Sequence, residues 1–174
     1  FCPVTGVNWN RNFTDVTKEN HFINSINSLI ENTKNEADFV EKIKVIIKET
    51  IEKLLEDVPY GISRGKKLSL ILQRESATAD IFLDMHTGPK ACEYLYVSER
   101  QKTLSKDLPF KQQIIIPNSF DDAMDEAYFS PWYYVEKQLN KGFLGGESYT
   151  VELGSEEFLN KELANYYFKK IIYF

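Results

Sequence analysis

An acid and a histidine stand two residues apart near the end of an apolar segment of this sequence. Asp84 and His86 follow the apolar run Ile81–Leu83, and Thr87–Pro89 comes next. Because side chains alternate along a strand, residues two apart point to the same side. A carboxylate and an imidazole emerging together at a strand end can form a metal or catalytic corner. The alternative is that His86 is a structural residue held by a hydrogen bond.

Two further short motifs flank this segment in a fixed order. Asn10-Arg11 lies upstream, within Gly6–Phe13, and Glu152 lies downstream, two residues before Gly154. With Asn-Arg, then Asp-x-His, then a strand ending in Glu-x-Gly, the chain resembles the zinc carboxypeptidase superfamily. It is most similar to the succinylglutamate desuccinylase and aspartoacylase branch, over roughly residues 4 to 156.

This resemblance implies zinc-dependent hydrolysis of an amide bond, in an N-acyl amino acid or at the C-terminus of a peptide. His86 would be a zinc ligand, and Asp84 would hold its imidazole in the binding orientation without touching the metal. Glu152 would be the general base that takes a proton from the attacking water. Asn10 and Arg11 would bind the substrate carboxylate, because a guanidinium fork matches a carboxylate bidentately.

One expected motif is missing from the sequence. In the family the metal is bound first by a His-x-x-Glu pair and then by a distant histidine, and this chain has only two histidines. His21 is followed by Phe-Ile-Asn and cannot open such a pair, so His86 alone matches. We therefore expect an N-terminally truncated fragment, itself inactive, whose two other ligands precede Asn10.

The position two residues before the Asn-Arg pair also departs from the family. In many relatives an acid stands there and steadies the first metal-binding histidine, whereas this chain has Asn8. The amide oxygen of Asn8 can still accept a hydrogen bond, but it carries no charge. This substitution puts the metal affinity of the site in doubt.

Two other classes of function stay open. The first is a binding or regulatory protein that keeps the fold and has lost the metal, as the missing ligands and Asn8 would suggest. The second is a metal site of another kind, built for example from Asp84, His86 and Glu93.

Composition narrows the class of protein. The chain has 174 residues, of which 43% are hydrophobic, enough to bury a sizeable core. A net charge of -5 argues against a nucleic-acid surface, which needs clustered basic residues. Cys2 and Cys92 are too few for a disulfide framework, and no apolar run is long enough to span a membrane. We expect a cytoplasmic protein with a small-molecule carboxylate substrate, and its oligomeric state stays open.

Periodicity predicts alternating helices and strands in one domain over residues 1–174. The expected fold is α/β, a mixed central sheet with helices on both faces. The resemblance makes it zinc carboxypeptidase-like (phosphorylase/hydrolase-like) and partial. Helical spacing of apolar residues predicts helices over 21–30, 37–55, 66–74, from Pro131 to 140, and over 156–172, and alternation or apolar runs predict strands over 80–86, 93–97, 113–117 and 149–153.

Overall fold

The computed structural model describes residues 3, 6–32, 36–157 and 160–173, and the chain divides into two compact units. Phe1–Phe82 and Asn118–Glu147 form the first, called the helical unit. Leu83–Pro117 and Ser148–Phe174 form the second, called the sheet unit. That residues 1–174 make a single domain stays a prediction. Among the described residues, no helix is long and apolar enough to cross a membrane.

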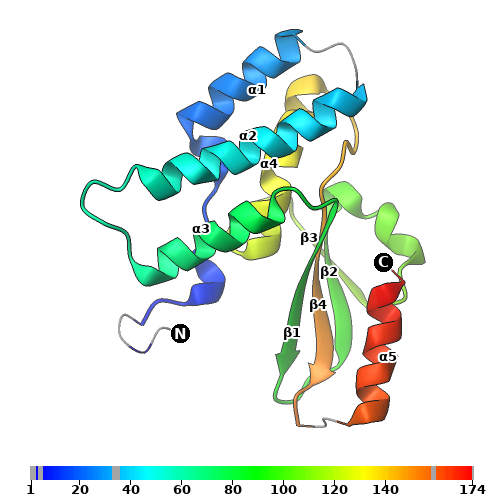
Figure 1. The fold of residues 1–174 in the computed structure, drawn as a ribbon. Coiled ribbons are helices and arrows are strands. Elements are labelled where there is room, and N and C mark those ends of the chain that lie inside the picture. Colours follow the sequence, from blue (N-terminus) through cyan, green and yellow to red (C-terminus); the bar gives the residue numbers. More distant parts are fainter. Residues whose placement is uncertain (1–2, 4–5, 33–35, 158–159, 174) are drawn as a thin grey trace. The chain divides into compact units, whose positions relative to one another are not determined.

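The helices of the helical unit are drawn in Figure 1, and their side chains bury an apolar core. Its described α-helices are α1 (Asn20–Asn32), α2 (Glu36–Glu56), α3 (Arg64–Ser76) and α4 (Met124–Leu139). The short 3-10 helices η1 (Trp9–Arg11) and η2 (Val16–Lys18) precede them. Apolar residues three and four apart on each helix supply the core, as the sequence predicts. Its most buried members are Val16, Phe22, Ile26, Ile43, Ile51, Leu70, Trp132 and Val135.

Helix α4 begins earlier than the sequence predicted. The prediction placed its start at Pro131, but the helix begins at Met124 and carries Pro131 in its interior. The reason is a cap: the Glu126 carboxylate accepts hydrogen bonds from the backbone N–H groups of Asp121 (2.5 Å) and Ala123 (3.2 Å). These bonds occupy donors that a helix start leaves unpaired, so Glu126, in the first turn of α4, caps the helix N-terminus.

The sheet unit is built on a mixed four-stranded sheet in the order β1-β4-β2-β3 (Figure 1). Its strands are β1 (Ile81–Gly88), β2 (Glu93–Ser98), β3 (Gln113–Ile116) and β4 (Glu147–Ser155), with η3 (Glu99–Gln101) and η4 (Leu104–Asp107) between β2 and β3. β2 runs parallel to β3 and antiparallel to β4. This sheet, accompanied by helices, confirms the predicted α/β class.

Hydrogen bonds at both ends show how β1 runs beside β4. The backbone N–H of Glu147 donates to the carbonyl of Asp80 (3.1 Å), and that of Glu156 donates to the carbonyl of Gly88 (2.8 Å). The first bond joins the starts of the two strands and the second joins their ends. β1 and β4 therefore run in the same direction.

One face of the sheet packs against an apolar core and the helix α5 (Lys161–Ile172). Leu83, Leu95, Val97, Tyr149 and Val151 belong to this core. Their odd numbers reflect the alternation of side chains along each strand. The even-numbered residues of β1, β2 and β4 thus point to the opposite face.

Helix α5 starts later and buries less than the sequence predicted. It begins at Lys161 rather than at residue 156, because the side chain of Asn160 caps it by accepting a hydrogen bond from the Leu163 N–H (2.8 Å). None of its residues is fully buried, and Tyr166, which helical spacing assigns to the same apolar face as Leu163 and Tyr167, is 46% exposed. Phe158 and Leu159, in the predicted helix range before Lys161, lie outside the described residues.

Candidate active site

The face of the sheet opposite α5 carries three of the residues singled out from the sequence. Asp84 and His86 lie on β1, and Glu152 lies on the neighbouring strand β4. Each alternates with a residue directed to the other face: Leu83 and Val151 belong to the apolar core, and Met85 lines the groove under α5. Asp84 and His86 therefore point to the same face of the sheet, as their spacing predicts.

Asp84 and His86 contact each other directly. Nε2 of His86 lies 3.0 Å from Oδ1 of Asp84, and both side chains are partly buried. A carboxylate on one ring nitrogen fixes the orientation of an imidazole whose other nitrogen binds a metal. The pair fits the donor chemistry expected of one zinc ligand and its supporting acid.

Glu152 lies directly across from a tyrosine of the neighbouring strand. Tyr94 of β2 and Glu152 of β4 are register partners, as are Tyr96 and Thr150. The rings of Tyr94 and Tyr96 meet edge to face, with centroids 5.2 Å apart. A hydrogen bond with Tyr96, burial and the charge of Glu152 together raise the pKa of Tyr94 to about 12. Tyr94 therefore presents a protonated phenol beside Glu152 at neutral pH.

Sequence reasoning missed this tyrosine pair. It treated residues 93–97 only as a strand, although Tyr94 and Tyr96 alternate there with Leu95 and Val97. The alternation was a usable signal, because it places both tyrosines on the face opposite the apolar core. Their position next to Glu152 could not be inferred, since it depends on the register between β2 and β4.

The Asn10-Arg11 pair lies in the helical unit, on η1. Both residues are exposed, and Nη1 of Arg11 donates to the carbonyl of Asn10 (2.7 Å). Asn8 caps this short helix: its Oδ1 accepts a hydrogen bond from the Asn10 N–H (3.1 Å). The amide oxygen of Asn8 thus acts as an acceptor, as expected, but its partner here is the backbone that carries the pair.

No three His, Cys, Asp or Glu side chains lie close enough to hold a metal ion among the residues that the structure describes. The alternative set of Asp84, His86 and Glu93 is not formed. Glu93 points to the α5 face, where its Oε1 accepts hydrogen bonds from Lys170 and from the Tyr166 hydroxyl (3.1 Å for the latter). Glu93 is therefore part of the attachment of α5 to the sheet.

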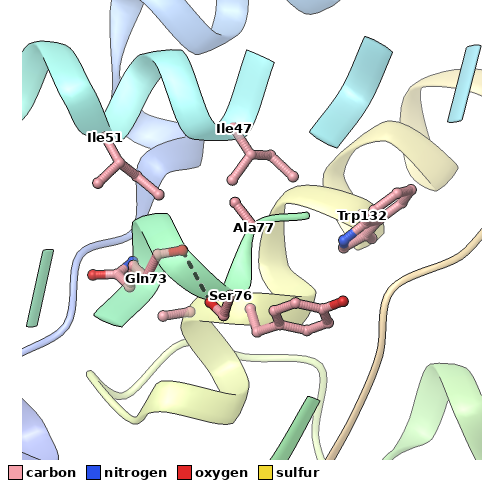
Figure 2. A pocket seen from close by; sticks show the side chains of 8 residues that line it. Ile47, Ile51, Gln73, Ser76, Ala77 and Trp132 are labelled. Atoms are coloured by element: carbon pink, nitrogen blue, oxygen red, sulfur yellow. Dashed lines mark hydrogen bonds between the residues drawn. The ribbon is translucent and has the colours of Figure 1, made fainter. Parts of the chain in front are cut away.

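Two hollows within the units do not coincide with these residues. A cavity of about 10 Å³ in the helical unit, near Ile47, Gln73 and Trp132, has room for about one water molecule (Figure 2). A groove of about 680 Å³ in the sheet unit runs between α5 and the ends of β1 and β4. The groove is the larger, but it lies on the face opposite Asp84 and His86. Size alone would misplace the candidate site, so we assign it from the chemistry of its residues.

Two solved structures resemble this chain in both fold and sequence. One is a candidate succinylglutamate desuccinylase/aspartoacylase from Shewanella frigidimarina NCIMB 400, with a TM-score of 0.81 and 35% identity, over 94% of this chain and 44% of that protein. The other is a candidate protein of the same family from Shewanella amazonensis SB2B, with a TM-score of 0.79 and 32% identity, over 94% of this chain and 45% of that protein.

The chain spans less than half the length of these two proteins. No protein-family model and no curated protein matches the sequence. Identity of about a third, together with fold agreement along nearly the whole chain, nevertheless supports the resemblance inferred from the three short motifs. That resemblance is therefore confirmed: over 94% of its length, the chain has the fold of the succinylglutamate desuccinylase/aspartoacylase family.

Proposed function

We propose that the protein is a zinc-dependent hydrolase that cleaves the amide bond of an N-acyl amino acid or a C-terminal peptide bond. The observation that carries the proposal is the placement of Asp84, His86 and Glu152 on one face of adjacent strands. The names of the two similar Shewanella proteins support a hydrolase acting on acylated amino acids.

In this proposal His86 would hold the zinc ion through a ring nitrogen, and Asp84, which contacts Nε2 of His86, would support it. The remaining protein ligands are those that the resemblance implies, a His-x-x-Glu pair that the given sequence does not contain. Bound zinc would supply a positive charge that polarises the scissile carbonyl and brings water to reactivity near neutral pH. The role of Asp84 is to keep the imidazole in its binding orientation.

Glu152 moves the proton in the proposed reaction. Its carboxylate accepts a proton from the attacking water and then delivers it to the departing amine nitrogen, so that the amide bond breaks without releasing a free amide anion. Tyr94, its register partner, keeps its phenol protonated on the same face of the sheet.

Asn10 and Arg11 bind the substrate carboxylate in this proposal. The planar guanidinium of Arg11 offers two parallel donors, and the Asn10 amide adds a third. Both side chains are exposed and so accessible to a ligand. This contact would select substrates that carry a free carboxylate.

Metal dependence tests the proposal directly. The full-length protein would be assayed with N-acetyl and N-succinyl amino acids before zinc removal by a chelator, after removal, and after zinc is added back. We expect hydrolysis to disappear with the metal and to return with it. Hydrolysis that survives complete zinc removal would refute zinc dependence. A full-length protein that binds N-acyl amino acids but hydrolyses none would favour the binding or regulatory alternative.

A further inference from the structure

The backbone that follows the Asn10-Arg11 pair is held by one polar face of α3. Lys66, Ser69 and Gln73 are three and four residues apart, so their side chains share a face of the helix. Ser69 and Gln73 are each only 3% exposed. Inward-directed polar residues need hydrogen-bond partners, and all three find them in the segment 12–14.

Gln73 forms two hydrogen bonds with the backbone of this segment, as a neighbouring strand would. Its Nε2 donates to the carbonyl of Thr14 (2.9 Å), and its Oε1 accepts from the N–H of Thr14 (3.0 Å). One side-chain amide thus satisfies both backbone groups of one residue. Figure 2 shows Gln73 on α3 with the adjacent hydrogen bond from the Ser76 hydroxyl to the Gln73 carbonyl (2.9 Å), which ties the residue to its own helix.

Lys66 holds the two preceding residues. Its Nζ donates to the carbonyls of Asn12 (3.2 Å) and Phe13 (3.3 Å), and burial lowers the pKa of Lys66 although the charges of Asp122 and Glu19 oppose this change. The side-chain amide of Asn12 also donates to the Ser69 hydroxyl (3.4 Å).

The start of α4 fixes the same segment independently of α3. The N–H of Phe13 donates to the carbonyl of Asp122 (3.3 Å), and the Phe13 ring is buried against Met124 and Ala127. Arg11 lies two residues before Phe13, and its own side chain is exposed. The location of the guanidinium therefore depends on how firmly the backbone after it is held.

We propose that Lys66 and Gln73 are positioning residues for the Asn10-Arg11 pair, fixing its backbone so that the pair is ordered before a carboxylate ligand arrives. The inference rests on the proposed function, which assigns carboxylate binding to this pair. A binding group that is already ordered loses less conformational entropy when the ligand binds. A small displacement of such a group has a large effect on rate.

The test compares two adjacent lysines of α3. Lys66→Met keeps the apolar stem and removes the ammonium, and Lys67→Met makes the same change on an exposed side chain. For each variant of the full-length, zinc-loaded protein, kcat and KM are measured with an N-acetyl amino acid and with its carboxyl-amidated form. We expect Lys66→Met to reduce the preference for the free carboxylate by about 10- to 100-fold, mainly through KM. Lys67→Met should leave the preference unchanged.

This comparison separates positioning from a merely structural role. Loss of folded protein lowers turnover of both substrates equally and leaves their ratio unchanged, so an unchanged ratio in Lys66→Met overturns the inference. Gln73→Met provides the second variant: it is close in size and lacks both hydrogen bonds to Thr14. The same loss of preference is expected.

Two measurements that need no turnover keep the inference separate from the proposed function. Amide hydrogen exchange of residues 12–14 and equilibrium binding of an N-acetyl amino acid are compared in the parent and in Lys66→Met. Faster exchange with weaker binding supports the inference even if the parent hydrolyses nothing, in which case only the proposed function fails. Unchanged binding in Lys66→Met, or a parent that binds no such carboxylate, overturns it.

Discussion

Tyr94 and Glu152 are direct partners across the antiparallel strands β2 and β4, on the face that also carries Asp84 and His86. The carboxylate charge of Glu152 disfavours ionisation of the Tyr94 phenol, because a negative charge disfavours forming a second one nearby. The pKa of Tyr94 is raised to about 12 by its hydrogen bond with Tyr96, by burial and by this charge. The relationship makes Tyr94 a reporter of the environment of Glu152.

The protonation of Tyr94 is the first testable consequence. Because the folded-state pKa of Tyr94, about 12, lies above its ordinary value of about 10, the stabilisation from its neutral form is complete below about pH 10 and is lost as pH rises toward 12. Ultraviolet titration of phenolate should show that the parent ionises a phenol near pH 12 that Tyr94→Phe lacks. If the only difference between Tyr94→Phe and the parent is the loss of a phenol that ionises near the ordinary pKa of about 10, the coupling of Tyr94 to Tyr96 and Glu152 is wrong.

Replacement of Glu152 by Gln should abolish most turnover while the fold and zinc content persist. The amide is nearly isosteric but cannot accept a proton, and loss of a general base typically costs about 10² to 10⁴ in rate. Hydrolysis of N-acyl amino acids would be measured together with zinc content and thermal stability. Glu156→Gln, an exposed change just after β4, is the control and should keep full activity. Parental activity in Glu152→Gln would make Glu152 a structural residue, and loss of zinc would make it a ligand.

Asp84→Asn should weaken zinc binding without removing a ligand. The change keeps the shape of the side chain but removes the charge that faces Nε2 of His86. Supporting residues of this kind typically contribute about 10- to 100-fold in metal affinity. Competition with a chelator of known affinity measures the change, and Asp107→Asn, on an exposed residue of the same unit, is the control. Equal zinc affinity in Asp84→Asn and the parent would reduce the pair to a strand-end hydrogen bond.

Arg11→Lys should weaken carboxylate binding while the fold hardly changes. Lysine keeps the positive charge but cannot form the two parallel hydrogen bonds of a guanidinium. We expect a loss of about 1.5 to 3 kcal/mol, the scale for hydrogen bonds to charged groups. Calorimetric binding of an N-acyl amino acid measures it, with Arg64→Lys, an exposed change at the start of α3, as the control. Identical affinities in the two variants would remove Arg11 from the site.

Gly146→Ala should destabilise the helical unit strongly. Gly146 has φ +66, and a Cβ atom there would overlap the indole ring of Trp132, which is fully buried in the core. Left-handed backbone costs a non-glycine residue about 1 to 3 kcal/mol, and overpacking adds a similar amount. Gly142→Ala is the control, since a Cβ there meets no atom within 4 Å. Equal denaturation midpoints for both variants would contradict the close approach of Gly146 to Trp132.

Local patterns in the sequence were enough to predict the helices α1, α2 and α3 and all four described strands, because periodicity follows from which face is buried. They failed where a side chain far along the chain, or a cap, decided the outcome. Glu126 caps α4 at Met124, although proline is common in the first turn of a helix and Pro131 was therefore predicted to start it. Asn160 caps α5, which begins at Lys161 and not at residue 156. The face shared by Asp84 and His86 was predictable from their spacing alone.

Other features of the candidate site could not be predicted from spacing. Glu152 reaches the same face through the register of β4, and Tyr94 becomes its partner by the register of β2. The contacts of Gln73 with Thr14 join residues far apart in sequence, and a glutamine within a helix gives no sign of them. Short motifs are the source of the chemistry that we propose, and long-range pairing decides what surrounds it.

The strand order also determines when the site can form. β1 and β2 are neighbours along the chain, yet β4, made from Glu147–Ser155, lies between them in the sheet. Glu152 can therefore come beside Asp84 and His86 only after the chain has been synthesised through β4. Such non-local pairing requires loop closure before any contact stabilises it, which slows folding. During synthesis on the ribosome, β1 and β2 cannot form their native pairing with β4 until β4 has been made.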